Sequence, residues 1–235
     1  MKFEGRNAVL ELLKTDKTVD KILIEKNPQG SLKKIFAEAR KKNLRVQFVD
    51  KKVLDKESAE GRHQGVIAFA TDYAYSAVED IAAAEGQNGL VIICDSIEDV
   101  HNLGAIIRVA ECAGANGVII PLNKSASVTE AVIRISAGAA EHIKVAKANS
   151  LVHAIEVLKK SGYWIYALEA DGTDIYKTDL SGKVALVIGG EDSGVRRLTR
   201  ENCDGCLSLP LYGKVNSLNA SVALGVAVYE VLRRR

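Results

Sequence analysis

The sequence predicts an α/β protein: a small N-terminal α/β domain, then a larger domain with a doubly wound, mostly parallel sheet. Uninterrupted apolar runs such as Val184–Ile188 are typical of strands covered on both faces, as in parallel sheets. From residue 89 onward these runs alternate with helical stretches, which indicates βαβ units. With 235 residues and 47% hydrophobic composition, the chain can bury one large core or two smaller ones.

Residues 1–72 are predicted to form the small domain. A basic helix at Ser31–Lys42 is expected between two strands, with Ser31 placed as its N-cap. The polar, alanine-containing residues 73–88 are predicted to link this domain to the second one, residues 89–235. The other expected elements of the small domain are helices at Glu4–Lys14 and Lys51–Ala59 and strands at Lys21–Glu25, Val46–Asp50 and Val66–Ala70.

The second domain is predicted to contain five strands alternating with five helices. Ligands of doubly wound sheets gather at the carboxyl ends of the strands, so we expect the functional site at that edge. The expected strands are Leu90–Cys94, Val118–Ile120, Trp164–Leu168, Val184–Ile188 and Leu207–Leu209. The expected helices lie near Gly104–Ala113, Thr129–Ala139, Leu151–Ser161, Val195–Asn202 and Leu218–Arg233.

The residues that follow the expected strand Val184–Ile188 give the strongest local indication of a functional site. Gly189 and Gly190 allow a sharp turn and a close ligand approach, because they have no Cβ atom. Glu191 and Asp192 follow at the position where open α/β sheets place their sites. The same residues also fit an ordinary strand-to-helix turn with a solvated acidic pair, so other segments must decide between these readings. No dinucleotide fingerprint, phosphate loop, nucleophile elbow or paired-histidine zinc motif occurs in the sequence.

The net charge of +2 is unevenly distributed. Residues 1–72 hold 16 Lys and Arg against 11 Asp and Glu, whereas the rest of the chain holds 16 against 19. A basic module joined to a near-neutral one suggests that the first binds a polyanion, although a solvated lysine-rich surface fits equally well. The N-terminus lacks the apolar core of a secretory signal. The late charge-poor run Val215–Tyr229 is shorter than the roughly 20 residues that span a bilayer. A soluble, cytoplasmic protein without a membrane partner is expected.

Four cysteines do not make a disulfide framework in a chain of this size. Cys203 and Cys206 have C-x-x-C spacing, but a zinc site needs two further ligands and no second such pair exists. Cys203 also follows a helical stretch, where the helix dipole raises rather than lowers a thiol pKa. We therefore interpret both cysteines as structural and expect no metal.

Three segments, in this order and at these strand ends, resemble the SpoU family of RNA ribose 2′-O-methyltransferases, part of the SPOUT class. They are Asn102–Arg108, Gly189–Gly194 and Leu209–Ala223, and the likeness covers residues 90–235. In the first domain, Gly5-Arg6-Asn7 and His63-Gln64-Gly65-Val66 resemble the substrate-binding domain of the subgroup that modifies a guanosine of 23S ribosomal RNA. Two positions depart from the family pattern: Val100 stands where many members have proline, and Asp192 replaces a common glycine.

The resemblance implies a deep trefoil knot in the C-terminal domain, and S-adenosylmethionine as methyl donor. Composition alone could not have indicated a knot, because knots are nearly absent from proteins. The donor is expected in an apolar, glycine-bearing slot with backbone donors and acceptors. The residues implied for that slot are Gly189, Leu209, Leu218, Leu168, Gly190, Ile188 and Pro210.

The resemblance also implies the residues that carry the reaction. Arg108 is expected to act on the ribose 2′-hydroxyl, either as a base or, as we favour, by holding the adjacent phosphate and stabilising alkoxide charge. The residues implied to position Arg108, the ribose and the loops are Asn102, Glu191, Ser217 and Asn219. The expected RNA contacts are Arg6, Asn7, Arg62, His63 and Gln64, for which helix-start and turn roles are the alternative.

The expected partners are RNA, most simply ribosomal RNA, and a second copy of the chain. Small residues along the last helix, such as Ser221, Ala223 and Gly225, permit close packing, within the chain or between subunits. The family likeness favours a homodimer with the active site near the subunit boundary. The alternatives are a transfer RNA 2′-O-methyltransferase and a non-catalytic RNA-binding assembly factor with the same fold.

Overall fold

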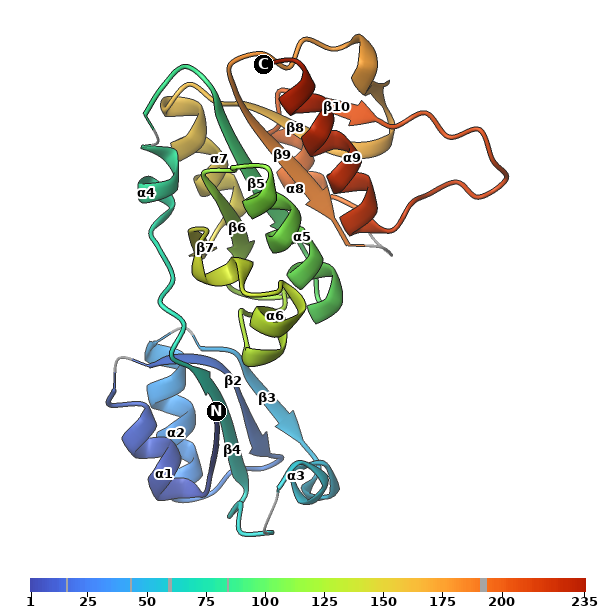
Figure 1. Cartoon of the computed structure of the whole chain (residues 1–235). Coiled ribbons are helices and arrows are strands. Elements are labelled where there is room, and N and C mark those ends of the chain that lie inside the picture. The colour runs from blue at the N-terminus through green and yellow to red at the C-terminus, as the bar shows by residue number, and fades with distance from the viewer. Residues whose placement is uncertain (16, 43, 59–60, 84, 191–193) are drawn as a thin grey trace. The chain divides into compact units, whose positions relative to one another are not determined.

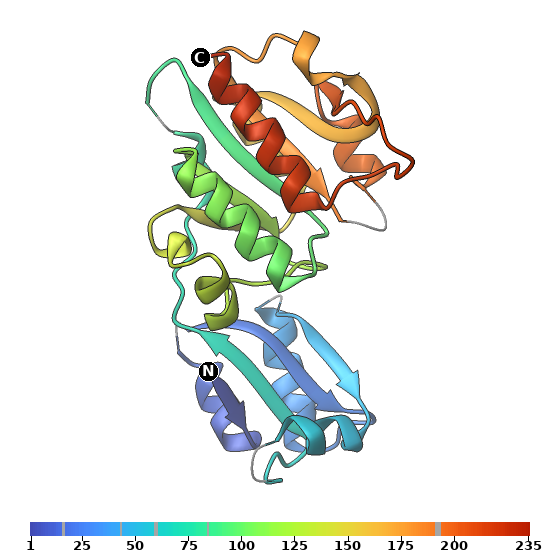
Figure 2. The same ribbon diagram turned by 45° about the vertical axis from the view of Figure 1, so that its right-hand side comes forward.

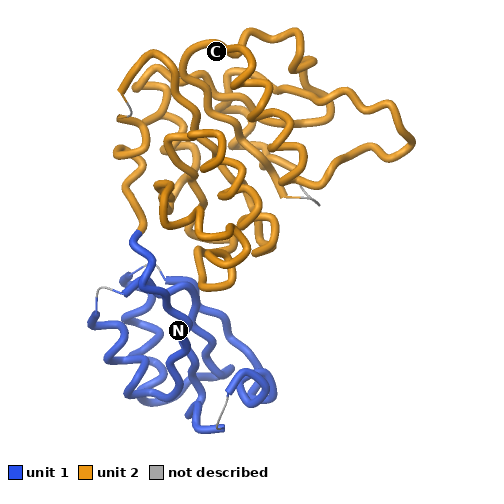
Figure 3. The backbone as a smooth tube through the Cα atoms, in the orientation of Figure 1, with its two compact units in different colours: residues 1–74 blue, residues 75–235 orange. Residues whose placement is uncertain are grey.

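The computed structural model describes residues 1–15, 17–42, 44–58, 61–83, 85–190 and 194–235. The chain divides into two compact units, Met1–Ala74 and Tyr75–Arg235 (Figure 3). Most of the segment expected as a linker thus falls within unit 2, where it contains the short helix α4 (Val78–Ala82). No helix of the described residues is long and apolar enough to cross a membrane.

Unit 1 is a four-stranded sheet with helices on both faces (Figure 1). The strand order is β1-β4-β2-β3, with β2 parallel to β3 and antiparallel to β4. Alternate side chains of β2 pack on opposite faces of the sheet. Ile22 and Ile24 pack with α1 and α2, whereas Leu23 packs with Leu54 of α3. The elements are β1 (Lys2–Glu4), α1 (Arg6–Leu12), β2 (Thr18–Glu25), α2 (Ser31–Lys41), β3 (Val46–Val49), α3 (Lys51–Glu57) and β4 (Val66–Thr71).

The start of unit 1 differs from the prediction. A helix from Glu4 was expected, but residues 2–4 form β1, which pairs with β4 far along the chain. Gly5 separates strand from helix with a φ of +90°, a conformation that glycine adopts without steric cost. The local pattern could not reveal a strand whose partner lies more than 60 residues away.

Unit 2 contains a six-stranded sheet in which every pair is parallel, so the predicted doubly wound α/β architecture is confirmed. The order is β10-β8-β9-β5-β6-β7. All seven residues of the central strand β5 are buried, which explains its unbroken apolar run. The strands are β5 (Gly89–Asp95), β6 (Gly117–Pro121), β7 (Val145–Ala148), β8 (Trp164–Asp174), β9 (Lys183–Gly189) and β10 (Gly205–Ser208).

Helices cover both faces of this sheet (Figures 1 and 2). On one face α5 packs side by side with α9 and also contacts α6, while on the other face α7 contacts α4 and α8. Residues 209–219 lead from β10, at the sheet edge, back to α9, which contacts α5 and β9. The threading of this segment through a loop stays a prediction. The helices are α5 (Val100–Cys112), α6 (Glu130–Ile135), α7 (Leu151–Lys160), α8 (Arg197–Glu201) and α9 (Ala220–Arg233), with 3₁₀ turns η1 (Ala139–Glu141) and η2 (Ile175–Lys177).

Two details of unit 2 were not predicted. The strand β7 was missed because its sequence, VAKA, is short and has no strong β pattern. The helix expected over 129–139 ends instead at Ile135, since Ala137 and Gly138 adopt left-handed conformations, with φ of +52° and +85°. Such residues stop a helix and turn the chain.

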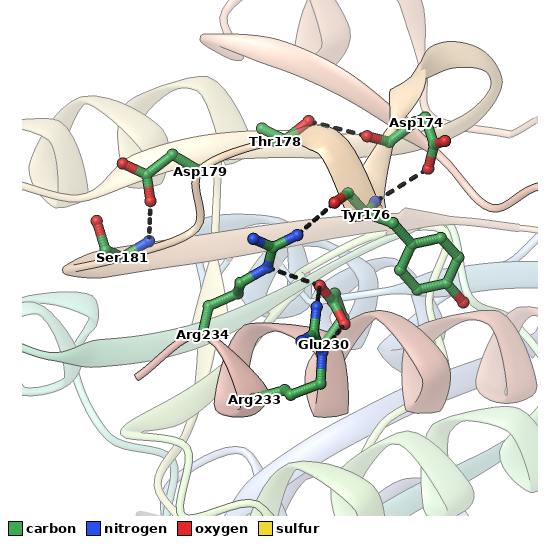
Figure 4. A network of polar contacts seen from close by, with 8 residues as sticks. All are labelled: Asp174, Tyr176, Thr178, Asp179, Ser181, Glu230, Arg233 and Arg234. Atoms are coloured by element: carbon green, nitrogen blue, oxygen red, sulfur yellow. Dashed lines mark hydrogen bonds and ion pairs between the residues drawn. The ribbon is translucent and has the colours of Figure 1, made fainter.

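An ion-pair network fixes the C-terminal end of α9 (Figure 4). Glu230, buried in the structure, accepts hydrogen bonds from the Arg233 guanidinium at 2.7 and 2.8 Å and from Arg234 Nε at 2.8 Å. Arg234 also donates to the carbonyl oxygen of Tyr176 in η2. The hydrogen bonds from Arg233, then those from Arg234, lower the pKa of Glu230 to about 2, against the opposing effect of burial. The network therefore joins the last helix to the connection between β8 and β9.

Candidate active site

A cleft of about 410 Å³ lies at the carboxyl ends of β8, β9 and β10. Three segments form its walls: Leu168–Ala170 of β8, the end of β9, and the connection from β10 to α9. The lining is Leu168, Glu169, Ala170, Ile188, Gly189, Gly190, Gly194, Leu207, Leu209, Leu211, Asn216, Ser217, Leu218, Ala220 and Ala223. It includes six of the seven residues expected to hold the methyl donor; the seventh, Pro210, is not part of the lining.

Backbone packing at the end of β9 requires glycine. A Cβ atom on Gly189 would lie 2.0 Å from the carbonyl carbon of Gly194, so the two chain segments touch through their main chains. Gly190 and Gly194 form a β-bridge, with the Gly194 N–H donating to the Gly190 carbonyl at 2.9 Å. Gly194 itself has a φ of +59°, in the left-handed region that favours glycine. The paired-glycine turn read from the sequence is thus a close main-chain contact on the cleft wall.

Two carboxylates accept hydrogen bonds from the main chain that follows Gly194. Glu169, at the cleft wall, accepts a 2.6 Å hydrogen bond from the Val195 N–H. Asp95, fully buried at the end of β5, accepts a 3.0 Å bond from the next N–H, that of Arg196, and a further bond from the Arg196 guanidinium. Sequence reasoning did not select either residue as part of the site. The available signal was an aspartate that ends a completely apolar strand, since a buried charge needs a specific partner.

Asn102 and Asn219 meet beside the cleft. Asn102 lies in the first turn of α5 and Asn219 is the N-cap of α9, and the Asn219 side-chain amide donates to the Asn102 side-chain oxygen at 2.9 Å. The side-chain oxygen of Asn219 accepts from the N–H groups of Ser221 at 3.0 Å and Val222 at 3.3 Å. The structure therefore brings together two of the expected positioning residues, and Ser217 lines the neighbouring cleft.

Arg108 is exposed on α5 and is not part of the cleft lining of its own chain. Its expected action on the ribose 2′-hydroxyl stays a prediction. Glu191 lies outside the described residues, as does Asp192, one of the two positions that differ from the family pattern. The other departure, Val100, is the first residue of α5, where the Asp99 side chain caps the helix by accepting from the His101 N–H at 3.0 Å.

The expected RNA contacts of unit 1 gather at the N-terminus of α1. Arg6 donates from Nε to the Gln64 carbonyl at 2.9 Å, and the Arg6 N–H donates to the Gln64 side-chain oxygen at 3.1 Å. Asn7, Arg62 and Gln64 are exposed. His63 differs from the expectation, because it is only 3% exposed. Its Nδ1 accepts from the Gly65 N–H at 3.0 Å and its Nε2 lies 2.9 Å from Asp55, so its contacts are those of a residue that shapes the turn.

The cysteines show packing contacts. Cys203 and Cys206 are free thiols, half-buried against the core under α7. Burial raises the pKa of Cys203 to about 12, which disfavours the thiolate needed for redox or metal chemistry. Among the described residues no group of three or more His, Cys, Asp and Glu could hold a metal ion.

The fold and the cleft define a SPOUT-type methyltransferase. A profile of the "SpoU rRNA Methylase family" matches residues 89–229, and one for "RNA 2'-O ribose methyltransferase substrate binding" matches residues 3–76. The chain therefore belongs to the SpoU family, as its motifs predicted, and is an S-adenosylmethionine-dependent RNA 2′-O-methyltransferase.

Relatives match nearly the whole chain. A protein of Xanthomonas axonopodis pv. citri named "23S rRNA (guanosine-2'-O-)-methyltransferase RlmB" is 42% identical over 98% of this chain and 95% of its own length. A protein of the same name from Xylella fastidiosa is 40% identical over 98% and 95%. A solved "AdoMet bound rRNA methyltransferase from Sinorhizobium meliloti" is 25% identical with a TM-score of 0.62, covering 99% of this chain and 87% of that one.

The cleft suits the methyl donor. Leucine and isoleucine side chains provide flat apolar walls for an adenine ring, and the chain ends of β9 and β10 present main-chain groups. Gly189 and Gly190 have no side chains, so at these two positions a ligand can approach the main chain at the end of β9. A volume of about 410 Å³ lies within the range of small-molecule and cofactor sites.

Proposed function

We propose that this protein methylates the ribose 2′-hydroxyl of a guanosine in 23S ribosomal RNA, and that it acts in the cytoplasm. The observation that carries the proposal is the cleft formed by β8, the end of β9 and the β10–α9 connection, next to the Asn102–Asn219 hydrogen bond. Relatives named for this reaction match unit 1 as well as unit 2, and unit 1 is the part that would select the RNA.

The proposed donor site uses the cleft lining, with Leu168, Ile188, Leu209 and Leu218 around the adenosine and Gly189 and Gly190 beneath it. S-adenosylmethionine supplies, when bound, an electrophilic methyl group on a sulfonium leaving group. What remains for the protein is to orient the hydroxyl and assist loss of its proton. Arg108 is proposed to hold the neighbouring phosphate and stabilise negative charge on the 2′-oxygen. A guanidinium suits this role because it stays protonated and binds phosphate in a fork geometry.

We propose that Arg108 reaches the cleft of a partner subunit. In its own chain it is exposed and outside the lining. Helix α9, which packs beside α5, exposes Val222, Val226 and Tyr229 at helical spacing, with Tyr229 56% exposed. An apolar stripe of this kind is expected to be covered by another protein surface. A homodimer formed through α5 and α9 would bury the stripe and bring the partner's Arg108 near the donor site.

Unit 1 is proposed to bind the RNA through the surface around the N-terminus of α1. Arg6 and Gln64 hold each other in place, and Asn7 and Arg62 are exposed beside them. The positive balance of residues 1–72 favours the approach of a polyanion.

Mapping of ribose methylation in a deletion strain tests the proposal. We expect one guanosine of 23S ribosomal RNA to lose its methyl group and to regain it on complementation. Loss of a transfer RNA methylation instead would establish the alternative substrate. An unchanged map, combined with absence of S-adenosylmethionine binding by calorimetry, would favour a non-catalytic RNA-binding protein.

A further inference from the structure

A second cleft, of about 500 Å³, lies at the carboxyl edge of the unit 2 sheet. It forms where Pro121 ends β6, the chain enters α7 and α8 begins. In the strand order β10-β8-β9-β5-β6-β7, the donor cleft lies at the β8–β10 half and this cleft at the β6–β7 half. Because all six strands are parallel, both clefts open on the same rim, and Asp95 at the end of β5 lies between them.

The lining of this second cleft fits an anion. Arg196 and Arg197 contribute guanidinium groups, and Asn123, Asn149 and Ser150 contribute amide and hydroxyl groups. Among the described residues that line it, none is an aspartate or glutamate. These side chains are the types that bind the phosphate oxygens of nucleic acids.

The guanidinium of Arg196 is already oriented by hydrogen bonds before an anion binds. The buried Asp95 carboxylate accepts hydrogen bonds from its N–H and its Nε, while its side chain remains 42% exposed. Among the described residues, its two terminal nitrogens have no acceptor. A guanidinium that is already oriented loses little conformational entropy when it binds phosphate.

Arg197 can bind a phosphate without a large loss of free energy. Its Nη1 pairs with Glu201 at 2.6 Å, but the two side chains are 80% and 53% exposed. Exposed ion pairs at this helical spacing contribute little, so a phosphate can replace the glutamate. Helix α7, ten residues long and capped by Ser150, also begins at this cleft, and its N-terminus favours negative charge.

We propose that this cleft binds phosphodiester groups of the RNA strand that flanks the methylated nucleotide. The inference rests on the proposed function, because it assigns a contact surface to the same substrate. It places RNA contacts on the catalytic unit itself, along the rim that also carries the donor cleft.

The test compares two arginines of one helix. Arg197 lines the cleft, whereas Arg200, one turn later, pairs with Asp171 at 2.8 Å and does not line it. Affinity for 23S ribosomal RNA is measured at several KCl concentrations for the whole protein and for the variants Arg197→Glu, Arg200→Glu and Asn149→Asp. Arg197→Glu and Arg200→Glu change the net charge equally, so the second controls for long-range repulsion.

We expect Arg197→Glu to weaken RNA binding about tenfold and to reduce the salt slope by about one, and Asn149→Asp to weaken it as well. Arg200→Glu should bind nearly as the wild type, and all variants should bind S-adenosylmethionine normally. Equal effects of Arg197→Glu and Arg200→Glu, or no effect of either, would overturn the assignment. If Arg197→Glu alone loses RNA binding while deletion of the protein leaves the methylation map unchanged, the proposed function is refuted but this contact is not.

Discussion

Asn219 donates a hydrogen bond of 2.9 Å to Asn102, and this bond joins the N-terminal turns of α9 and α5 beside the donor cleft. The two residues are 117 positions apart in the chain. The amide of Asn219 has two tasks: its nitrogen reaches Asn102, and its oxygen caps α9. Their separate contributions can be measured.

Asn219→Ala is expected to lower the free energy of unfolding by about 1 kcal/mol, the usual effect of removing a helix N-cap. It should also weaken cofactor binding, because Ser217 and Leu218 of the cleft precede the cap directly. Asn219→Asp is the matched control: it retains the capping oxygen but loses the donor to Asn102. Equal stability of the alanine and aspartate variants, measured by urea unfolding, would contradict the capping role.

Gly189→Ala should disrupt the donor cleft. Its new Cβ would lie 2.0 Å from Gly194, so the main chain must move, at a cost of about 1–3 kcal/mol or more. Calorimetry should then show at least a tenfold loss of S-adenosylmethionine affinity. Gly213→Ala serves as the control, since a Cβ there meets no atom within 4 Å. Cofactor binding by Gly189→Ala at wild-type strength would exclude the close contact.

Acid should weaken the attachment of α9. The pKa of Glu230 in the folded protein is about 2, below its usual value of 4.5, chiefly because of hydrogen bonds from Arg233. A group with a lowered pKa stabilises the folded state above its unfolded pKa and loses that effect as the pH falls. The stability difference between wild type and Glu230→Gln should therefore be largest above about pH 4.5 and shrink toward pH 2. A difference that stays constant in urea unfolding over this range would show that Glu230 does not contribute through its charge.

Arg108→Ala should abolish methylation and leave cofactor affinity nearly unchanged, because Arg108 does not line the cleft of its own chain. Single-turnover methylation and calorimetry measure the two effects separately. Arg108→Lys keeps a positive charge, so partial activity in this variant would support a role for charge at this position. Wild-type turnover in the alanine variant would remove Arg108 from the mechanism.

Mixing two inactive variants tests the shared active site. Leu168→Lys places a cation in the cleft proposed to bind the donor, where it would repel a sulfonium, and Arg108→Ala removes the guanidinium proposed to act on the 2′-oxygen. If Arg108 serves the partner's cleft, a heterodimer of the two has one intact site, and an equal mixture should recover about a quarter of wild-type activity by the statistics of symmetric dimers. If mixing restores no activity although co-purification of differently tagged subunits shows heterodimers, Arg108 acts within its own subunit.

By itself the sequence determined the α/β class, the parallel sheet and six of the seven residues expected in the cleft. Apolar runs such as that of β9 follow from burial on both faces, and the glycines at its end follow from a close main-chain contact, so both leave local marks. The tertiary structure decided what depends on distant partners. In the folded chain, Glu169 and Asp95 accept hydrogen bonds from the consecutive N–H groups of residues 195 and 196. His63 is buried, residues 2–4 pair with β4 as the strand β1, and Arg108 does not line the cleft of its own chain. Such features have no local periodicity, because they depend on which surfaces meet once strands far apart in the chain pair into a sheet.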